Sequence, residues 1–254
     1  MFPELMFSII IIAFILEFFD ASLGMGYGTT LAPLLLLMGF APLEAIPTVL
    51  LTNAVIGPVA GFFHHRFENV DLRFKSKYFK TTLVLTVFGA LGILIATLIA
   101  VELPENILKA YIGLLVLTVG IFVLVRHKKK RPFSWKKITG LGSLAAFNKG
   151  MTGGGYGSVI VGGQIIAGID GKKAVGIASV AEGLICIIGV LGYLSINTLV
   201  HLNWSLIVSL LIGALASIPL AAYVVRKFHP KKLKIAIGIF SIILGTAILT
   251  KLFL

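Results

Sequence analysis

The chain of 254 residues is 58% hydrophobic, and only 13% of its residues are charged. Soluble domains are roughly half apolar and about a quarter charged, so this composition argues against an ordinary soluble domain and predicts a polytopic membrane protein. The net charge of +12 would suggest nucleic-acid binding in a soluble protein, but here the basic residues gather in short loops between apolar segments. We therefore predict a multi-pass protein of the cytoplasmic membrane that contacts the lipid bilayer and binds no nucleic acid.

The single cysteine, Cys186, excludes a disulfide within the chain and a metal cage built from cysteines. The first residues, "MFPELMFSIIIIAF", lack the basic start and the small-residue cleavage site of a secretory signal. We therefore expect them to begin the first membrane segment.

Ten apolar segments follow one another along the chain, and we expect them to be helical. Their approximate ranges are 4–20, 24–40, 43–64, 78–100, 105–126, 136–148, 153–169, 172–195, 205–226 and 231–252. Six of them are close to the roughly 20 residues that cross a bilayer core, namely 43–64, 78–100, 105–126, 172–195, 205–226 and 231–252. The other four are shorter and form two pairs, each joined by a glycine-rich stretch.

The charges of the loops predict how the helices cross the membrane. The loops at 64–80, 126–137 and 226–234 are basic and should face the cytoplasm, whereas the acidic loop 101–106 and the uncharged loop 195–204 should face outward.

Two stretches far apart in the chain resemble each other, and we call them the first and second glycine knots. Asp20–Thr29 reads "DASLGMGYGT" and Lys149–Ser158 reads "KGMTGGGYGS". The same offset of 129 residues continues to Asn53, which falls on Glu182, and an offset of 125 aligns "LKAYIG" with "LKIAIG" near the ends of the two halves. These matches predict an internal duplication.

The two halves should have opposite orientations in the membrane, because the basic loop 64–80 corresponds to the uncharged loop 195–204. We therefore predict two inverted repeats, residues 1–126 and 138–254, joined by a basic cytoplasmic linker at 127–137. Each repeat would be a glycine-broken helical hairpin followed by three transmembrane helices.

Each glycine-broken pair of segments must cross the membrane an even number of times. Residues 4–40 precede a helix that should run inward, and "GIDGKK" (168–173), with its two lysines, should lie on the side of 126–137. Because the paired segments are short and bent at glycines, we expect re-entrant hairpins with their turns near the midplane. The alternative is two crossings per pair, which gives ten spans in place of six.

The glycine knots predict an anion site. Each knot begins a half-helix whose first N–H groups lack intrahelical partners and carry partial positive charge, and two such termini that meet across a pseudo-two-fold axis would bind an anion. The expected substrate-binding residues are the knot residues and the polar residues at membrane depth: Gly24, Gly26, Tyr27, Gly28, Thr29, Asn53, Asn148, Lys149, Thr152, Gly153, Gly155, Tyr156, Gly157, Ser158 and Glu182. The alternative is that the glycines only permit tight helix packing.

The charged residues at membrane depth are one cation and three carboxylates. Lys149 should supply positive charge to the anion, or else form an ion pair with Asp20. Glu17 and Asp20 share a helix face, and together with Glu182 they are candidates for carrying a coupled proton. The alternative for Glu17 and Asp20 is a wet surface position where both titrate normally.

The two knots and the residues after them resemble the sulfite exporter TauE/SafE family, also called the four-toluene-sulfonate uptake permease family. The resemblance rests on "GMGYGTTLAPLLLLMGFAPLEAIPTVLLTN" (24–53) and "GGGYGSVIVGGQIIAGIDGKKAVGIASVAEG" (153–183). It covers the whole chain in size, duplication and segment order, and it implies transport of sulfur-containing anions such as sulfite or organosulfonates. The second repeat has Gly162 where the first has Pro33, so the two hairpins need not be equivalent.

The leading hypothesis is a secondary transporter that moves a small sulfur-containing anion across the cytoplasmic membrane without a cofactor. The sequence has no ATP-binding motif and no convergent catalytic set, so we expect a transporter and no enzyme, coupled to a proton or other ion gradient or to the anion gradient alone. A passive anion channel is the nearest alternative. A metal-cation permease that uses histidines such as His64 and His65 is a more distant one. Assembly as a homo-oligomer is left open.

Overall fold

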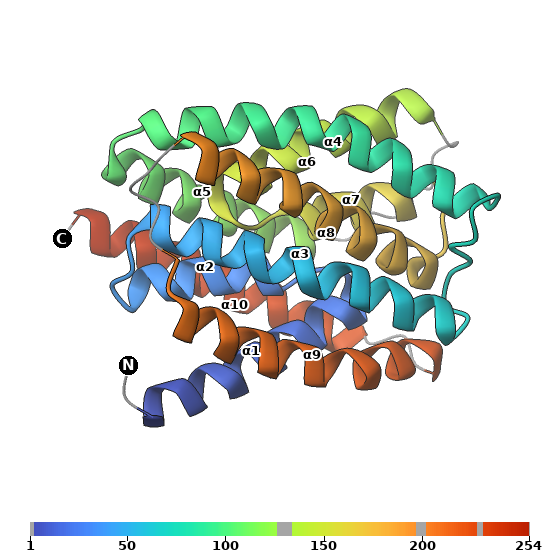
Figure 1. Cartoon of the computed structure of the whole chain (residues 1–254), viewed down its shortest axis with the longest axis horizontal. Helices are drawn as coiled ribbons and strands as arrows, with labels where there is room; N and C mark the ends of the chain where they lie inside the picture. The colour runs from blue at the N-terminus through green and yellow to red at the C-terminus, as the bar shows by residue number, and fades with distance from the viewer. Residues whose placement is uncertain (1–2, 126–133, 197–201, 228–230, 254) are drawn as a thin grey trace.

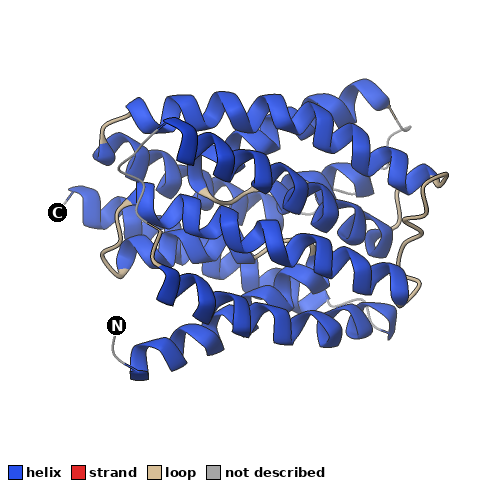
Figure 2. Cartoon of the chain, viewed as in Figure 1, coloured by secondary structure: helices blue, strands red, loops and turns tan. Residues whose placement is uncertain are grey.

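The computed structural model describes residues 3–125, 134–196, 202–227 and 231–253, and every regular element within these residues is an α-helix (Figure 2). The predicted all-α class is therefore confirmed. Most of the predicted linker, residues 127–133, lies outside the described part of the chain.

The described residues form ten helices, one for each predicted segment. In chain order they are α1 (Pro3–Leu23), α2 (Tyr27–Leu37), α3 (Pro42–Arg66), α4 (Lys77–Glu102), α5 (Glu105–Leu124), α6 (Trp135–Thr152), α7 (Tyr156–Ile166), α8 (Gly171–Ile196), α9 (Trp204–Lys227) and α10 (Lys231–Phe253). Seven of them are long and apolar enough to cross a membrane, namely α1, α3, α4, α5, α8, α9 and α10. The short helices α2 and α7 have 11 residues each.

The first helix is longer than its apolar segment predicts. The apolar run predicts an end at Asp20, but α1 continues to Leu23 and stops at Gly24, where φ is +69°. Asp20 stays inside the helix, and its carboxylate accepts a hydrogen bond from the backbone N–H of Tyr27, beyond the helix end. The structure thus adds α1 to the six segments of spanning length.

Helices from opposite halves of the chain lie side by side in one bundle (Figure 1). The main partner of α1 is α9, and that of α6 is α4; α3 packs against α8, and α5 against α10. Most residues of α2 and α7 are buried, and among the candidate spans α3 and α8 are the most buried. This packing places the two knots in the interior of the bundle.

The ends of the helices sort into two groups along the bundle. In Figure 1, α1 begins and α10 ends at the left, where the turns after α2 and α4 also lie. The loop between α3 and α4 and the turn between α7 and α8 lie at the right. These two segments belong to the predicted cytoplasmic loops 64–80 and 168–173, so their common end agrees with the orientation that the charges predict.

Glycines allow α5 and α10 to approach closely. A methyl group on Gly120 would lie 2.9 Å from the carbonyl oxygen of Gly238, and one on Gly245 would lie 2.8 Å from the carbonyl oxygen of Gly113. Under the offset of 125 residues, Gly113 corresponds to Gly238 and Gly120 to Gly245, so the two contacts are equivalent. Small residues with this role are typical of helix interfaces in membranes.

Replacing Gly120 by alanine should destabilise the fold. The added methyl group would lie 2.9 Å from both the carbonyl oxygen of Gly238 and the backbone nitrogen of Ile242, so the helices must shift, at a cost of about 1–3 kcal/mol. The Gly120→Ala protein in detergent should unfold at a lower temperature than the wild type. Gly140→Ala on α6 is the matched control, since no described atom lies within 4 Å of its added methyl group. Equal unfolding temperatures for the two variants would contradict the prediction.

Candidate functional site

Each knot reverses the chain between a long helix and a short one. Gly24 and Gly26 have φ values of +69° and +143°, and Gly153 and Gly155 have values of +73° and +82°. Residues with a Cβ rarely adopt such angles. The glycines at these four positions are therefore needed for the shape of the backbone.

The two knots pack backbone against backbone at the centre of the bundle. A methyl group on Gly28 would lie 2.2 Å from the carbonyl oxygen of Gly153, and one on Gly157 would lie 2.2 Å from the carbonyl oxygen of Gly24. Under the offset of 129 residues each contact is the counterpart of the other. No side chain fits between the knots at these points, so they also require glycine.

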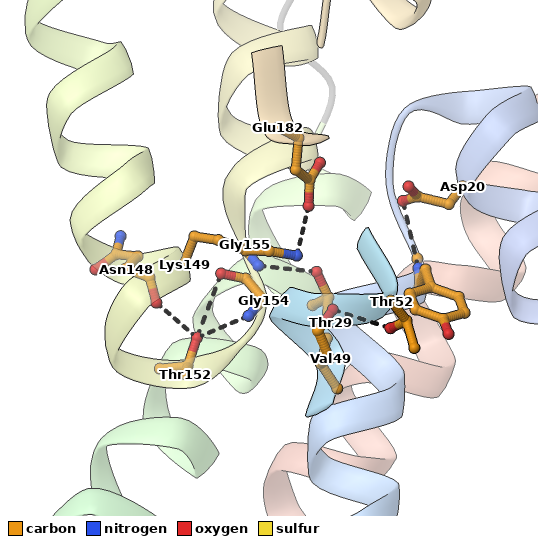
Figure 3. Close-up of polar contacts among 12 residues, drawn as sticks. Asp20, Thr29, Val49, Thr52, Asn148, Lys149, Thr152, Gly154, Gly155 and Glu182 are labelled. Carbon is orange, nitrogen blue, oxygen red and sulfur yellow. Dashed lines mark hydrogen bonds and ion pairs between the residues drawn. The ribbon is translucent and has the colours of Figure 1, made fainter. Parts of the chain in front are cut away.

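Hydrogen bonds join the knots and brace the second one (Figure 3). The backbone N–H of Gly155 donates to the hydroxyl oxygen of Thr29 at 3.1 Å, and the N–H of Gly154 donates to the hydroxyl of Thr152 at 3.1 Å. The hydroxyl of Ser158 donates to the carbonyl of Gly155 at 3.2 Å. These bonds matter because a bilayer core offers no water to irregular backbone.

A carboxylate holds the start of α2. The N-cap residue, Gly26, has no side chain, and the N–H of Tyr27 donates to Oδ1 of Asp20 at 3.3 Å. The hydroxyl of Thr30 donates to the carbonyl of Gly26. Negative charge is favourable at a helix N-terminus, so a group of this chain takes the position where a free anion would bind.

Lys149 and Glu182 form a buried ion pair, with Nζ 2.6 Å from Oε1 and side-chain exposures of 0% and 9% (Figure 3). Among the described ion pairs, the partner of Lys149 is Glu182. The alternative prediction, an ion pair between Lys149 and Asp20, does not hold in this structure. The pair lies between the two short helices. A methyl group on Gly28 would lie 2.6 Å from Nζ of Lys149, and one on Gly157 would lie 3.4 Å from Oε2 of Glu182.

Beside the ion pair lies a cavity of about 10 Å³, enough for about one water molecule. Its lining consists of Glu17, Asp20, Asn53, Ile56, Gly57, Ala60, Ser179 and Glu182. Oε2 of Glu17 and Nδ2 of Asn53 have no hydrogen-bond partner among the described residues, although these two residues are only 2% and 3% exposed. The cavity therefore brings together the three carboxylates predicted for proton coupling.

Other predicted site residues have partners away from this cavity. Oδ1 of Asn148 accepts from the hydroxyl of Tyr111 on α5 at 2.6 Å, and the hydroxyl of Thr152 donates to the carbonyl of Asn148 at 2.8 Å. Tyr27 and Tyr156, which begin α2 and α7, are fully buried. The hydroxyl of Tyr156 has no partner within the described part of the chain.

Four residues of the cavity lining were not predicted: Ile56, Gly57 and Ala60 on α3, and Ser179 on α8. Helical periodicity could have found them. The three on α3 lie one or two turns after Asn53, and Ser179 lies one turn before Glu182, so they share a helix face with those residues. Small and apolar residues in an apolar run give no other signal.

A second buried polar cluster ties down the end of α3. Nε2 of His64 lies 2.8 Å from the carbonyl oxygen of Ala21, and Nδ1 lies 3.1 Å from Nδ2 of Asn69, which also donates to the carbonyl of Ala222. Because Asn69 donates to Nδ1, the proton of the neutral imidazole is on Nε2. The described residues contain no group of three or more His, Cys, Asp and Glu side chains that could hold a metal ion.

A larger cavity of about 490 Å³ lies between α1, α2 and α10. It is lined by Ile12, Ile15, Leu16, Phe19, Gly26, Thr30, Leu34, Ala236, Ile237 and Phe240. An anion in this groove would lose its hydration and gain almost no polar contacts. The groove therefore suits hydrocarbon and is a poor site for an anion.

The fold and the site define a class of protein. Irregular backbone at membrane depth is tolerated where it is buried or lines a cavity, and broken helices whose ends meet there are typical of secondary transporters. The long apolar helices, the opposed knots and the buried ion pair fit a multi-pass membrane transporter.

Comparison with known proteins gives the family. The model of the family "Sulfite exporter TauE/SafE" matches residues 9–248. The chain is also 32% identical over 253 residues to the "Probable membrane transporter protein YtnM" of Bacillus subtilis (strain 168), an alignment that covers 94% of this chain and 81% of that protein. No solved structure matches. The chain belongs to the TauE/SafE family of membrane transporters, as the resemblance predicted, and it is a transporter, not an enzyme.

Removing one member of the buried ion pair should destabilise the protein more than removing both. Lys149→Met leaves the Glu182 carboxylate unpaired, and breaking a buried pair in this way costs about 3–5 kcal/mol. The double variant Lys149→Met/Glu182→Gln contains no unpaired charge and should recover most of that loss. Thermal unfolding in detergent measures both effects.

An exposed ion pair provides the control. Lys109 and Glu105 on α5 are 2.6 Å apart, with exposures of 31% and 55%, so Lys109→Met should cost less than about 1 kcal/mol. If the double variant is no more stable than Lys149→Met, the two charges do not stabilise each other as described.

Proposed function

We propose that the protein is a secondary transporter that moves a small sulfur-containing anion, such as sulfite or a sulfonate, across the cytoplasmic membrane. The anion binds at Lys149, between the first turns of α2 and α7. One observation carries this proposal: a fully buried ammonium group lies against the first turn of α2, and its ion-pair partner lies against the first turn of α7. Ionisable groups at membrane depth are usually functional, and a lysine beside two helix N-termini is complementary to an anion.

The packing supports two inverted repeats, residues 1–126 and 138–254. In the two repeats α1 corresponds to α6, and α4 corresponds to α9. The contact between α1 and α9 is therefore equivalent to the contact between α6 and α4, whereas the contacts α3–α8 and α5–α10 each join two equivalent helices. The paired glycine contacts at the knots and between α5 and α10 have the same reciprocity. Reciprocal contacts of this kind are expected of two repeats related by a two-fold axis, which in our proposal lies in the membrane plane.

The arrangement of the first hairpin supports a re-entrant element. α1 begins and α2 ends at the same end of the bundle (Figure 1). The turn between them is buried, because a methyl group on Gly24 would lie 2.4 Å from the side chain of Val161 on α7. In our proposal each hairpin enters from one side of the membrane, turns at its knot and leaves on the same side.

The size of the polar cavity favours a transporter over a channel. About one water molecule fits there, so sulfite or a sulfonate requires side chains or half-helices to move. A site that rearranges to admit its ligand fits alternating access better than a continuously open pore. The three carboxylates that line the cavity are the groups that could couple the movement to protons.

Sulfite or methanesulfonate should stabilise the purified protein. At about 100 times its dissociation constant a ligand adds about 2.7 kcal/mol to the stability of the folded state, which raises the unfolding temperature. Lys149→Met/Glu182→Gln should show no shift, because it lacks the cation without leaving a buried charge unpaired. Lys109→Met should respond like the wild type. If the ligand raises the unfolding temperature of the double variant as much as that of the wild type, the anion binds elsewhere.

Transport assays separate the transporter from the channel. In proteoliposomes loaded with unlabelled sulfite, uptake of radiolabelled sulfite should be accelerated and should saturate with concentration. Single-channel currents carried by the anion would instead support the channel.

Equivalent loops of the two repeats should be accessible from opposite sides of the membrane. Phe74, in the loop before α4, is 81% exposed, and Ser205, at the start of α9, is also exposed. In a Cys186→Ala background, single cysteines at these two positions should react with an impermeant thiol reagent from opposite sides. Reaction of both from one side would exclude inverted repeats.

A further inference from the structure

We propose that Glu182 occupies the anion position in the ligand-free protein, and that a singly charged anion replaces it at Lys149 while Glu182 takes up a proton. Anion and proton would then bind together. This inference rests on the proposed anion site and adds to it the charge of the substrate and the identity of the coupled ion.

Carboxylates of the chain lie at the starts of both half-helices. Asp20 accepts the N–H of Tyr27 at the start of α2. Oε2 of Glu182 lies 3.4 Å from the position of a methyl group on Gly157, in the first turn of α7, while its other oxygen contacts Lys149. The positions that favour a free anion are thus already filled, and a substrate anion must compete with Glu182.

The charges around Lys149 determine which protonation state Glu182 must adopt when an anion is bound. One cation, Lys149, lies near three carboxylates, and its charge is balanced by Glu182. An incoming anion that pairs with Lys149 would leave the Glu182 carboxylate buried without a partner. Burial of an unpaired charge is far more costly than burial of the neutral acid. Glu182 must therefore bind a proton when the anion arrives.

The cavity beside the ion pair can supply that proton. It is lined by Glu182 together with Glu17 and Asp20, and it has room for about one water molecule. Oε2 of Glu17 and Nδ2 of Asn53 are buried there without partners among the described residues. A donor and an acceptor left unsatisfied in one small cavity are the groups that an ordered water would bridge, and such a water would connect the carboxylates.

The titratable groups that surround Glu182 affect the replacement of its carboxylate by the anion. From the helices packed around it these groups are Glu17 and Asp20 on α1, Lys149 on α6, Tyr156 on α7 and Cys186 on its own helix. Tyr27 on α2 faces Glu17 and Asp20. Lys149 is the one cation in this set, and its ion-pair partner is Glu182, so an anion that pairs with Lys149 takes the place of the Glu182 carboxylate.

The exchange conserves charge within the protein. The Nζ–Oε1 contact breaks, Nζ donates instead to an oxygen of the anion, and Glu182 changes from carboxylate to carboxylic acid with a proton that reaches it through the cavity. With a monoanion, such as a sulfonate or bisulfite, the net charge of the site does not change. A dianion such as sulfate would leave one negative charge without a partner, so it should bind more weakly.

Methanesulfonate is the probe that tests this inference, because it keeps a single charge throughout the useful pH range. In the wild type its dissociation constant should rise about tenfold per pH unit on the alkaline side, the slope for linkage to one proton. A pH indicator in weakly buffered solution should record the uptake of about one proton per bound anion.

Glu182→Gln imitates the protonated acid, so it should bind methanesulfonate without pH dependence or proton uptake. Glu102→Gln, at the exposed end of α4, is the matched control and should behave like the wild type.

Two results would overturn the inference: binding to the wild type without proton uptake, or an unchanged pH slope in Glu182→Gln. The first would leave the proposed anion site intact. If neither methanesulfonate nor sulfite stabilises the wild type at any pH, the proposed function fails and the inference fails with it. If Glu182→Gln does not fold, proton uptake by the wild type still decides.

Discussion

The backbone contact between the two glycine knots is the constraint on which the rest of the structure depends. Gly28 lies against the carbonyl of Gly153, and Gly157 lies against that of Gly24, with no space for a methyl group. Irregular backbone cannot face lipid, so the two broken helices cover each other, and α3 and α8 pack together in the most buried part of the bundle. The same contact brings together the starts of α2 and α7, so a charged side chain buried at this point lies close to helix N-termini.

The two halves contribute equivalent backbones but different charges. In the second half, Lys149 and Glu182 form an ion pair. Their counterparts in the first half, Asp20 and Asn53, cannot, and they lie instead in the lining of the polar cavity. A nearly symmetric scaffold therefore carries an asymmetric site with one cation and several acids. In the transport mechanism that we propose, this asymmetry would give the anion one binding position and leave carboxylates to exchange protons.

Local features of the sequence were enough to predict the helices and the knots. Each helix follows from a continuous apolar run, and each break follows from glycines that adopt positive φ. The partner of Lys149 could not be predicted this way, because Glu182 lies 33 residues away and Asp20 was an equally plausible partner in the aligned repeats. The end of α1 differs from the prediction because Asp20 interrupts the apolar run without interrupting the helix. Long-range packing decides both features, and no local pattern records it.

An experimental structure with a bound anion tests the central claim most directly. Selenite is a heavier analogue of sulfite, and its selenium atom can be located by anomalous scattering. We expect its density within hydrogen-bond distance of Nζ of Lys149, between the first turns of α2 and α7, with the Glu182 carboxylate displaced from the lysine. Selenite bound elsewhere, with the contact between Lys149 and Glu182 intact, would contradict the account.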